Sequence, residues 1–264
     1  MTNTHPEQFG AGRIDTPDLL LAWEEAPWDS RIFGAPVLQV TDIAVRGSSA
    51  HADTRAFVRS RDALGALLVS CRLAHDRLPE SMMLESIGFR FIEMVFQPEL
   101  ELAGLPSAEP LQPLTVEPAR DEDLTAIEAI AASAFTNERF HADPRLPRER
   151  ADQRYRQWAR SSHGHASQRL MALREDGDLV AFFVTEQLPD ATCYWHLTAV
   201  APSAQGRGIG RRAWQTMLAR AKAEGAGRVR SSIAARNHRV LNLYASLGFR
   251  FPPPRMTFHW VSTP

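Results

Sequence analysis

The sequence predicts an α/β protein, of the α+β kind, built from two parts. Short runs rich in β-branched residues, such as Val37–Val45, alternate with segments of helical spacing, such as Arg211–Lys222. A glycine-rich turn joins a strand-like segment to a helix-like one within residues 197–249. A proline-rich stretch at 98–118 separates an N-terminal part from a longer C-terminal part.

Composition narrows the class of protein. The chain has 264 residues, of which 44% are hydrophobic and 23% charged, which is enough apolar material for a buried core. The net charge of −1 argues against a general nucleic-acid or anionic-membrane binder. We expect a cytoplasmic protein, because the N-terminus has no signal-peptide core and no apolar run is long enough to span a bilayer. Cys71 and Cys193 fit no metal-ligand spacing, so we expect buried free thiols and no metal.

Four regions follow from these patterns. We expect a flexible N-terminus at 1–17, an α/β domain at 18–98, a linker at 99–114 and a larger domain at 115–264. Each domain contains a helix that ends in Ser-x-Gly-Phe, at Ser86–Phe89 and at Ser246–Phe249, followed by a strand. The N-terminal domain is therefore a candidate degenerate copy of the other, although an unrelated α/β domain remains the alternative.

The turn after Leu197–Pro202 has the chemistry of an anion site. Gly206, Gly208 and Gly210 allow a close backbone approach, and the turn opens onto a helix N-terminus, where amides lack partners and the peptide dipoles add positive charge. A phosphate or pyrophosphate suits such a site. The glycine spacing excludes the dinucleotide fingerprint, and no Gly-Lys-Ser/Thr follows for a nucleoside triphosphate.

The segment Gln205–Gly210 resembles the Gln-x-x-Gly-x-Gly motif of the GCN5-related N-acetyltransferases (GNATs). Asn237, Leu243-Tyr244 and Gly248-Phe249 resemble the second motif of that family, with Val240 where alanine is usual. The resemblance covers roughly the last 150 residues. It implies the GNAT fold, a mixed sheet splayed to hold acetyl-CoA, and no CoA site in the N-terminal domain, which lacks the glycine turn.

The resemblance also implies roles for individual residues. The glycine turn would bind the pyrophosphate, the backbone of the preceding strand would face the pantetheine and acetyl groups, and Asn237 would bond the pantetheine or cap its helix. Tyr244 would give a proton to the CoA thiolate, although a packing role is the alternative. The expected cofactor-binding residues are Thr198, Ala199, Val200, Gln205, Gly206, Arg207, Gly208, Ile209, Gly210, Arg211, Asn237, Asn242 and Tyr244.

The general base has three candidates. His196 shares a strand face with Thr198 by period-two alternation and titrates near neutrality as a residue type. Glu186, at the end of the preceding strand, is its rival, and a water relay is the third option.

The acceptor side depends on a looser resemblance. Trp28-Asp29-Ser30, Phe140–Pro144, Tyr155-x-x-Trp158 and Thr257–Trp260 are similar to segments of the TDP-fucosamine acetyltransferases and their sugar-modifying relatives. This implies a nucleotide-linked amino sugar as the acceptor. The implied substrate-binding residues are Phe140, His141, Asp143, Tyr155 and Trp158.

We therefore expect an acetyl-CoA-dependent N-acetyltransferase that acts on a small amine by direct attack in a ternary complex, since neither motif contains a cysteine. An amino sugar is the leading acceptor. An amino acid, a polyamine, an antibiotic or a protein N-terminus are the alternatives, and a non-catalytic acyl-CoA-binding regulator is the alternative of another class. A monomer or a homodimer would suit this function, and the sequence does not decide between them.

Overall fold

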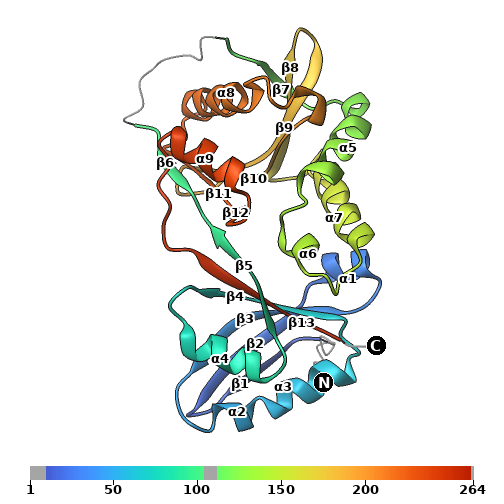
Figure 1. Ribbon diagram of the computed structural model, residues 1–264, viewed down its shortest axis with the longest axis vertical. Helices are drawn as coiled ribbons and strands as arrows, with labels where there is room; N and C mark the ends of the chain where they lie inside the picture. The colour runs from blue at the N-terminus through green and yellow to red at the C-terminus, as the bar shows by residue number, and fades with distance from the viewer. Residues whose placement is uncertain (1–9, 104–111, 263–264) are drawn as a thin grey trace, which may run out of the picture. The chain divides into compact units, whose positions relative to one another are not determined.

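The computed structural model describes residues 10–103 and 112–262, which form two compact units (Figure 1). Unit 1 contains the described parts of Met1–Met94, Asp143–Leu146 and Arg255–Pro264, and unit 2 contains those of Val95–Ala142 and Pro147–Pro254. These bounds differ from the expected domains 18–98 and 115–264, because two segments of the C-terminal part belong to unit 1. Each unit is described by itself.

Unit 2 is built on a mixed six-stranded sheet with the order β6-β11-β10-β9-β8-β7. Its strands are β6 (Glu99–Glu101), β7 (Thr115–Pro118), β8 (Gln168–Glu175), β9 (Asp178–Gln187), β10 (Thr192–Val200) and β11 (Arg228–Ser231). Its helices are α5 (Leu124–Ala134), α6 (Arg139–Ala142), α7 (Arg148–Ser161), α8 (Ile209–Ala223) and α9 (His238–Ser246). The short β12 (Ile233–Ala234) pairs with Val95 and Phe96. Part of the expected linker 99–114 is thus strand β6, while 104–111 lie outside the described residues.

Strand β10 is paired on one edge along most of its length but loses its neighbour β11 on the other edge partway along. It pairs antiparallel with β9 along its whole described length from Cys193 to Val200, but parallel with β11 only from Thr192 to Trp195. The β9–β10 register shifts between Trp195 and Leu197, so His196 lies in a β-bulge. Beyond the bulge, the β10 edge that faces away from β9 is not paired by β11.

Aromatic side chains form the centre of the unit 2 core. Phe183, Trp195, Trp214 and Tyr244 are each at most 2% exposed, and their rings meet edge to face. Helix α8 contributes Trp214 from its buried face. Tyr244 is therefore held in a packed cluster and not on a flexible surface.

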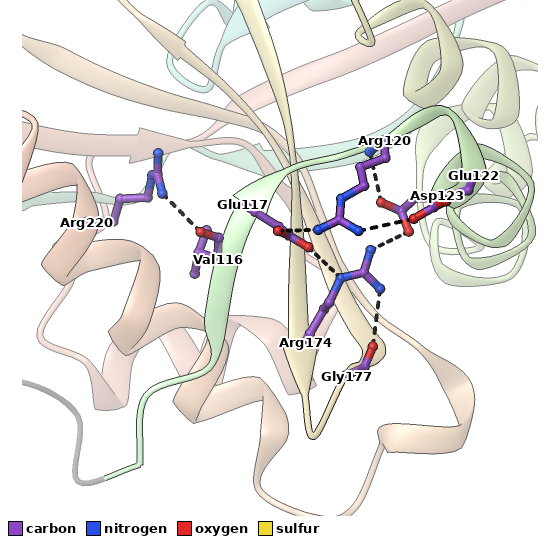
Figure 2. A network of polar contacts seen from close by, with 8 residues as sticks. All are labelled: Val116, Glu117, Arg120, Glu122, Asp123, Arg174, Gly177 and Arg220. Atoms are coloured by element: carbon purple, nitrogen blue, oxygen red, sulfur yellow. Dashed lines mark hydrogen bonds and ion pairs between the residues drawn. The ribbon is translucent and has the colours of Figure 1, made fainter.

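An ion network fixes β7 to β8 and to the turn before α5 (Figure 2). The Arg174 guanidinium donates from Nε to Glu117 Oε1 at 2.8 Å and from Nη2 to Asp123. The Arg120 amide donates to Asp123 Oδ2 at 2.9 Å, which closes the turn. Burial raises the pKa of Asp123, but the hydrogen bonds from Arg120 and Arg174 outweigh it and hold the pKa below its usual value.

Unit 1 contains the first six strands of a mixed seven-stranded sheet, whose order is β1-β2-β3-β4-β13-β5-β12. Its strands are β1 (Gly12–Asp15), β2 (Leu19–Glu25), β3 (Val37–Val45), β4 (Leu68–Ala74), β5 (Arg90–Phe96) and β13 (Arg255–Val261). Its helices are α1 (Pro27–Phe33), α2 (Ala50–Asp53), α3 (Arg55–Ala63) and α4 (Leu78–Ser86). Strand β1 lies within the stretch 1–17 that was expected to be flexible, where residues 1–9 are outside the described part.

The two units repeat one arrangement. Strand β3 pairs parallel with β4 over four residues that end at Val40–Cys71, just as β10 pairs with β11 up to Trp195–Ser231. The β2–β3 register then shifts, which places Thr41 in a bulge where β10 has His196. Helices α4 and α9 each span nine residues, and both have matching N-cap backbone angles. Unit 1 therefore has the organisation of an internal copy of unit 2.

Candidate active site

The glycine turn leads from the end of β10 into α8. Gly208 is the N-cap residue with φ 78°, and Gly206 has φ 79°, a region that favours glycine. Within the described residues no side chain caps this helix, and a Cβ atom added at Gly206 or Gly208 would meet no atom within 4 Å. The first amides of α8 therefore face open space with the positive end of the helix dipole behind them.

Ion pairs and a hydrogen bond fix the side chains of the glycine turn to neighbouring elements. Glu175, at the end of β8, binds Arg207 at 2.8 Å and also binds Arg212. The Arg212 hydrogen bond is the main reason that the pKa of Glu175 lies below its usual value. Gln205 accepts a hydrogen bond from Arg239 Nη1 at 2.9 Å. The expected pyrophosphate-binding residues are thus brought together, and arginines surround them.

The β10 edge beside the turn carries Thr198, Ala199 and Val200. The Ala201 amide donates to Val180 O at 2.8 Å on the β9 side, so the Val200 amide faces the opposite edge by strand alternation. On that edge β11 has already diverged. The Val200 carbonyl accepts from Gln205 Nε2 at 3.5 Å, whereas the Val200 amide faces the edge that β11 leaves unpaired.

Tyr244 lies on α9 beneath this edge with a fully buried side chain. Its hydroxyl makes no hydrogen bond to any described residue within normal geometric limits. Burial raises the pKa of Tyr244 to about 12, against the opposing effect of the nearby polar groups of Ser231, Trp214 and Thr198. A buried hydroxyl without a partner costs about 1–3 kcal/mol. The polar groups of Ser231, Trp214 and Thr198 lie near this hydroxyl.

The two asparagines of α9 differ. Asn237 is the N-cap residue, and its Oδ1 accepts a hydrogen bond from the Val240 amide at 3.4 Å. Asn242 is exposed and lies two residues from the buried Tyr244, which places it on the opposite side of the helix. The structure therefore gives Asn237 a capping contact and does not bring Asn242 to the β10 edge.

The two rival base candidates form one pair. His196 Nε2 lies 2.7 Å from Glu186 Oε2, and both side chains are about one-fifth exposed. Hydrogen bonds from Ser167 and then from His196 hold the pKa of Glu186 below its usual value, so the carboxylate is ionised. A carboxylate bound to Nε2–H leaves Nδ1 of a neutral ring as the proton acceptor.

Aromatic rings extend from this pair. Tyr194 and Trp158 flank the His196 ring, with centroids 4.7 Å and 6.0 Å away. Tyr155 stacks with Trp158 at 6.5 Å and with His141 at 5.7 Å. The structure therefore joins three of the expected acceptor residues to His196. Sequence analysis missed Tyr194, although its position two residues before His196 places it on the same strand face.

The remaining acceptor candidates, Phe140 and Asp143, are buried and contact charged side chains. Phe140 is 1% exposed, and the Arg139 and Arg154 guanidinium groups lie over its ring at 4.5 Å. Asp143 belongs to unit 1, where its buried carboxylate binds Arg145 at 2.8 Å and His259 at 3.0 Å.

The thiols are poor nucleophiles. Burial raises the pKa of Cys193 to about 11 and that of Cys71 to about 12, so both stay protonated near neutrality. Across residues 10–103 and 112–262, no three His, Cys, Asp or Glu side chains come together as a metal site. In the same ranges no helix combines the length and the apolar character that a bilayer crossing requires.

Comparison with known proteins gives a family match. Residues 124–249 match the acetyltransferase (GNAT) family model. The spore coat polysaccharide biosynthesis protein SpsD of Bacillus subtilis (strain 168) is 25% identical over 252 residues, which is 92% of this chain and 85% of that protein. Residues 124–249 therefore form a GNAT acetyltransferase domain, and this match supports acyltransferase activity.

Two solved structures show the same fold. A GCN5-related N-acetyltransferase from Sphaerobacter thermophilus aligns with a TM-score of 0.63 at 14% identity, over 95% of this chain and 83% of that one. A tandem GNAT protein from the clavulanic acid biosynthesis pathway aligns with a TM-score of 0.58 at 17% identity, over 94% of this chain and 80% of that one. The two-unit arrangement thus has a tandem counterpart.

Proposed function

We propose that this chain transfers an acetyl group from acetyl-CoA to the primary amine of an amino sugar, free or nucleotide-linked, by direct attack in a ternary complex. One observation carries the proposal: the open edge of β10 ends in the uncapped glycine turn and passes the buried hydroxyl of Tyr244, near Thr198. Acetyl-CoA has three matching groups: its pyrophosphate suits the glycine turn, its amide-containing arm suits the β10 edge, and its thioester suits the Tyr244 hydroxyl.

Acetyl-CoA would supply an activated acetyl group as a thioester. The amides of Gly206–Gly210 and the nearby arginines would hold its phosphates, because amides at a helix N-terminus and guanidinium groups both favour oxyanions. Thr198 and Val200 would bond its amides along β10. Tyr244 would donate a hydrogen bond to the departing sulfur, which its raised pKa permits because the phenol stays protonated.

His196 would accept the proton of the attacking amine at Nδ1. Glu186 would hold the Nε2–H tautomer and stabilise the imidazolium that forms, by its 2.7 Å hydrogen bond. The buried, protonated thiols favour direct attack over a covalent acetyl-enzyme.

The aromatic side chains beside His196 favour a ring-shaped acceptor. Trp158 and Tyr194 provide flat apolar faces next to the base, which suit the C–H face of a sugar ring. The relation to a protein named for polysaccharide biosynthesis supports the same acceptor class.

The test combines a cofactor variant with an acceptor panel. Gly208→Asp places a carboxylate where the phosphates would bind, and Gly208→Asn is its uncharged match, since both residue types tolerate positive φ. We expect calorimetry to show acetyl-CoA affinity lowered much more by Asp than by Asn, with both variants folded. Thiol release by the wild type should be fastest with amino sugars. Unchanged affinity in Gly208→Asp would refute the CoA assignment, and a preference for amino acids or polyamines would refute the acceptor class.

A further inference from the structure

In each unit a strand loses its parallel neighbour partway along: β3 is paired by β4 only up to Val40, and β10 by β11 only up to Trp195. We call the unpaired edge beyond that point the gap, and the internal repeat allows the two gaps to be compared residue by residue. From the bulge onward, Ile43 and Val45 of β3 occupy the register positions of Thr198 and Val200 of β10. The Arg46 amide donates to Asp18 O at 2.7 Å, as the Ala201 amide donates to Val180 O. The Ile43 carbonyl and the Val45 amide therefore face the gap beside β3.

In unit 1 this gap is filled by side chains of the chain itself. Arg77 Nη2 donates to Ile43 O at 2.9 Å, and the Val45 amide donates to Glu80 Oε1 at 3.0 Å. Arg77 Nη2 and Glu80 Oε1 are also paired at 2.7 Å. Glu80 is only 4% exposed, and its hydrogen bond from Arg77 is the main cause of a lowered pKa, so a buried carboxylate is held ionised there. Asp42 and Asp76 also face Arg77 and reinforce its charge.

Unit 2 has no such contacts at the matching helix positions. Counted back from the shared Ser-x-Gly-Phe ends, Arg77 corresponds to Asn237 and Glu80 corresponds to Val240. The Val240 side chain has no polar atom, and Asn237 Oδ1 is used to cap its own helix. Helix α4 thus fills the gap in unit 1, whereas its counterpart α9 leaves the β10 edge of unit 2 open for a ligand.

The turn after β3 is closed as well. Asp18 Oδ2 accepts a hydrogen bond from the Ser49 amide at 3.2 Å. A Cβ atom added at Gly47 would lie 1.8 Å from Asp18 Oδ1, whereas the space beside Gly206 and Gly208 is open. The backbone just after β3 is therefore packed against a carboxylate of the chain itself, unlike the open space beside Gly206 and Gly208.

We propose that the side chains of Arg77 and Glu80 fill the unit 1 gap and make the main-chain hydrogen bonds that a ligand would make along β10. The chain would therefore bind one acetyl-CoA and not two. In unit 1 the main-chain groups of β3 that would face a ligand are then hydrogen-bonded by side chains of the chain itself. The stoichiometry rests on the proposed function, whereas the occupant rests only on the contacts of unit 1.

Residue-resolved amide hydrogen exchange on the full chain tests this proposal. In the wild type we expect the Val45 amide to be protected with or without acetyl-CoA, and the Val200 amide to become protected only when acetyl-CoA is added. Glu80→Ala should speed exchange at Val45 about tenfold or more, because it removes a hydrogen bond to a charged acceptor. Glu80→Gln keeps an acceptor oxygen and should keep most of the protection, so a folded comparison remains even if the alanine variant unfolds. Glu85→Ala, on the exposed side of α4, is the matched control and should leave Val45 unchanged.

Calorimetry completes the test. We expect one acetyl-CoA per chain in the wild type and no residual site in Gly208→Asp. A second site, fast exchange at Val45 in the wild type, or slower exchange at Val45 on adding acetyl-CoA would each overturn the proposal. If acetyl-CoA gave neither heat nor protection at Val200, the proposed function would fail, while the Val45 result would still decide whether Glu80 fills the gap.

Discussion

Tyr244→Phe separates chemistry from packing at the centre of the proposed site. The ring stays in place, held by Phe249 at 4.6 Å, Trp214 at 6.0 Å and Trp195 at 6.4 Å. Only the hydroxyl is lost, and that hydroxyl has no partner among the described residues. The stability of the ligand-free protein should therefore stay the same or rise slightly, because a buried polar atom without a partner is removed.

The expected loss of rate follows from the hydrogen bond to the leaving sulfur. A phenol with a pKa of about 12 is a weaker acid than a thiol, whose pKa is near ~8.5, so complete proton transfer to the thiolate is uphill. The hydroxyl would then act mainly as a donor to the developing charge, an interaction worth about 1.5–3 kcal/mol, or roughly 10–150-fold in rate. Proton transfer within the transition state would extend this toward ~10⁴-fold. We expect kcat to fall by about 10²-fold while the dissociation constant of acetyl-CoA changes little.

The assay is thiol release under saturating acetyl-CoA, with melting temperature and acetyl-CoA affinity measured on the same preparation. Phe249→Leu is the packing control: it disturbs the same aromatic cluster, so it should lower the melting temperature more than kcat. A Tyr244→Phe enzyme whose kcat stays within about threefold of wild type, far below the range for a general acid, would show that Tyr244 is a packing residue.

Three further predictions concern other parts of the chain. His196→Gln should lower kcat by ~10²-fold or more, and the remaining rate should rise with pH as the free amine loses its proton in solution; a kcat equal to wild type would point to a water relay. Asp123→Asn should lower the melting temperature at pH 7, because the wild-type pKa is depressed in the folded state; the difference should shrink as pH falls below ~4, where the carboxylate of the unfolded chain takes up its proton and then that of the folded state follows at lower pH, and a pH-independent difference would contradict the Arg174 pairing. Phe258→Ala, at a site 1% exposed in β13, should destabilise unit 1 by ~3–5 kcal/mol in urea unfolding; a loss below about 1 kcal/mol would show that the strand is dispensable.

The sequence by itself determined the features that depend on short spacings. The glycine spacing in Gln205–Gly210 predicted a glycine turn at a helix start, and Gly206 and Gly208 have positive φ just before α8. That this turn binds an anion stays a prediction. The β-branched alternation of Val37–Val45 predicted a strand with the bounds that β3 has. Such signals are local, because glycine conformation and side-chain alternation are properties of a few neighbouring residues. The repeated Ser-x-Gly-Phe endings were likewise enough to suggest an internal copy.

Only the tertiary structure decided which distant groups meet. Glu186 and His196 looked like rivals in the sequence, but the antiparallel register of β9 and β10 places them 2.7 Å apart. The buried carboxylate of Asp143, an acceptor candidate in the sequence, binds Arg145 and also His259 of β13, which lies more than a hundred residues away in the chain. The pairing of Val45 with Glu80 has no local signal either. Strand register and helix packing bring these groups together across long stretches of chain, and neither composition nor periodicity carries that information.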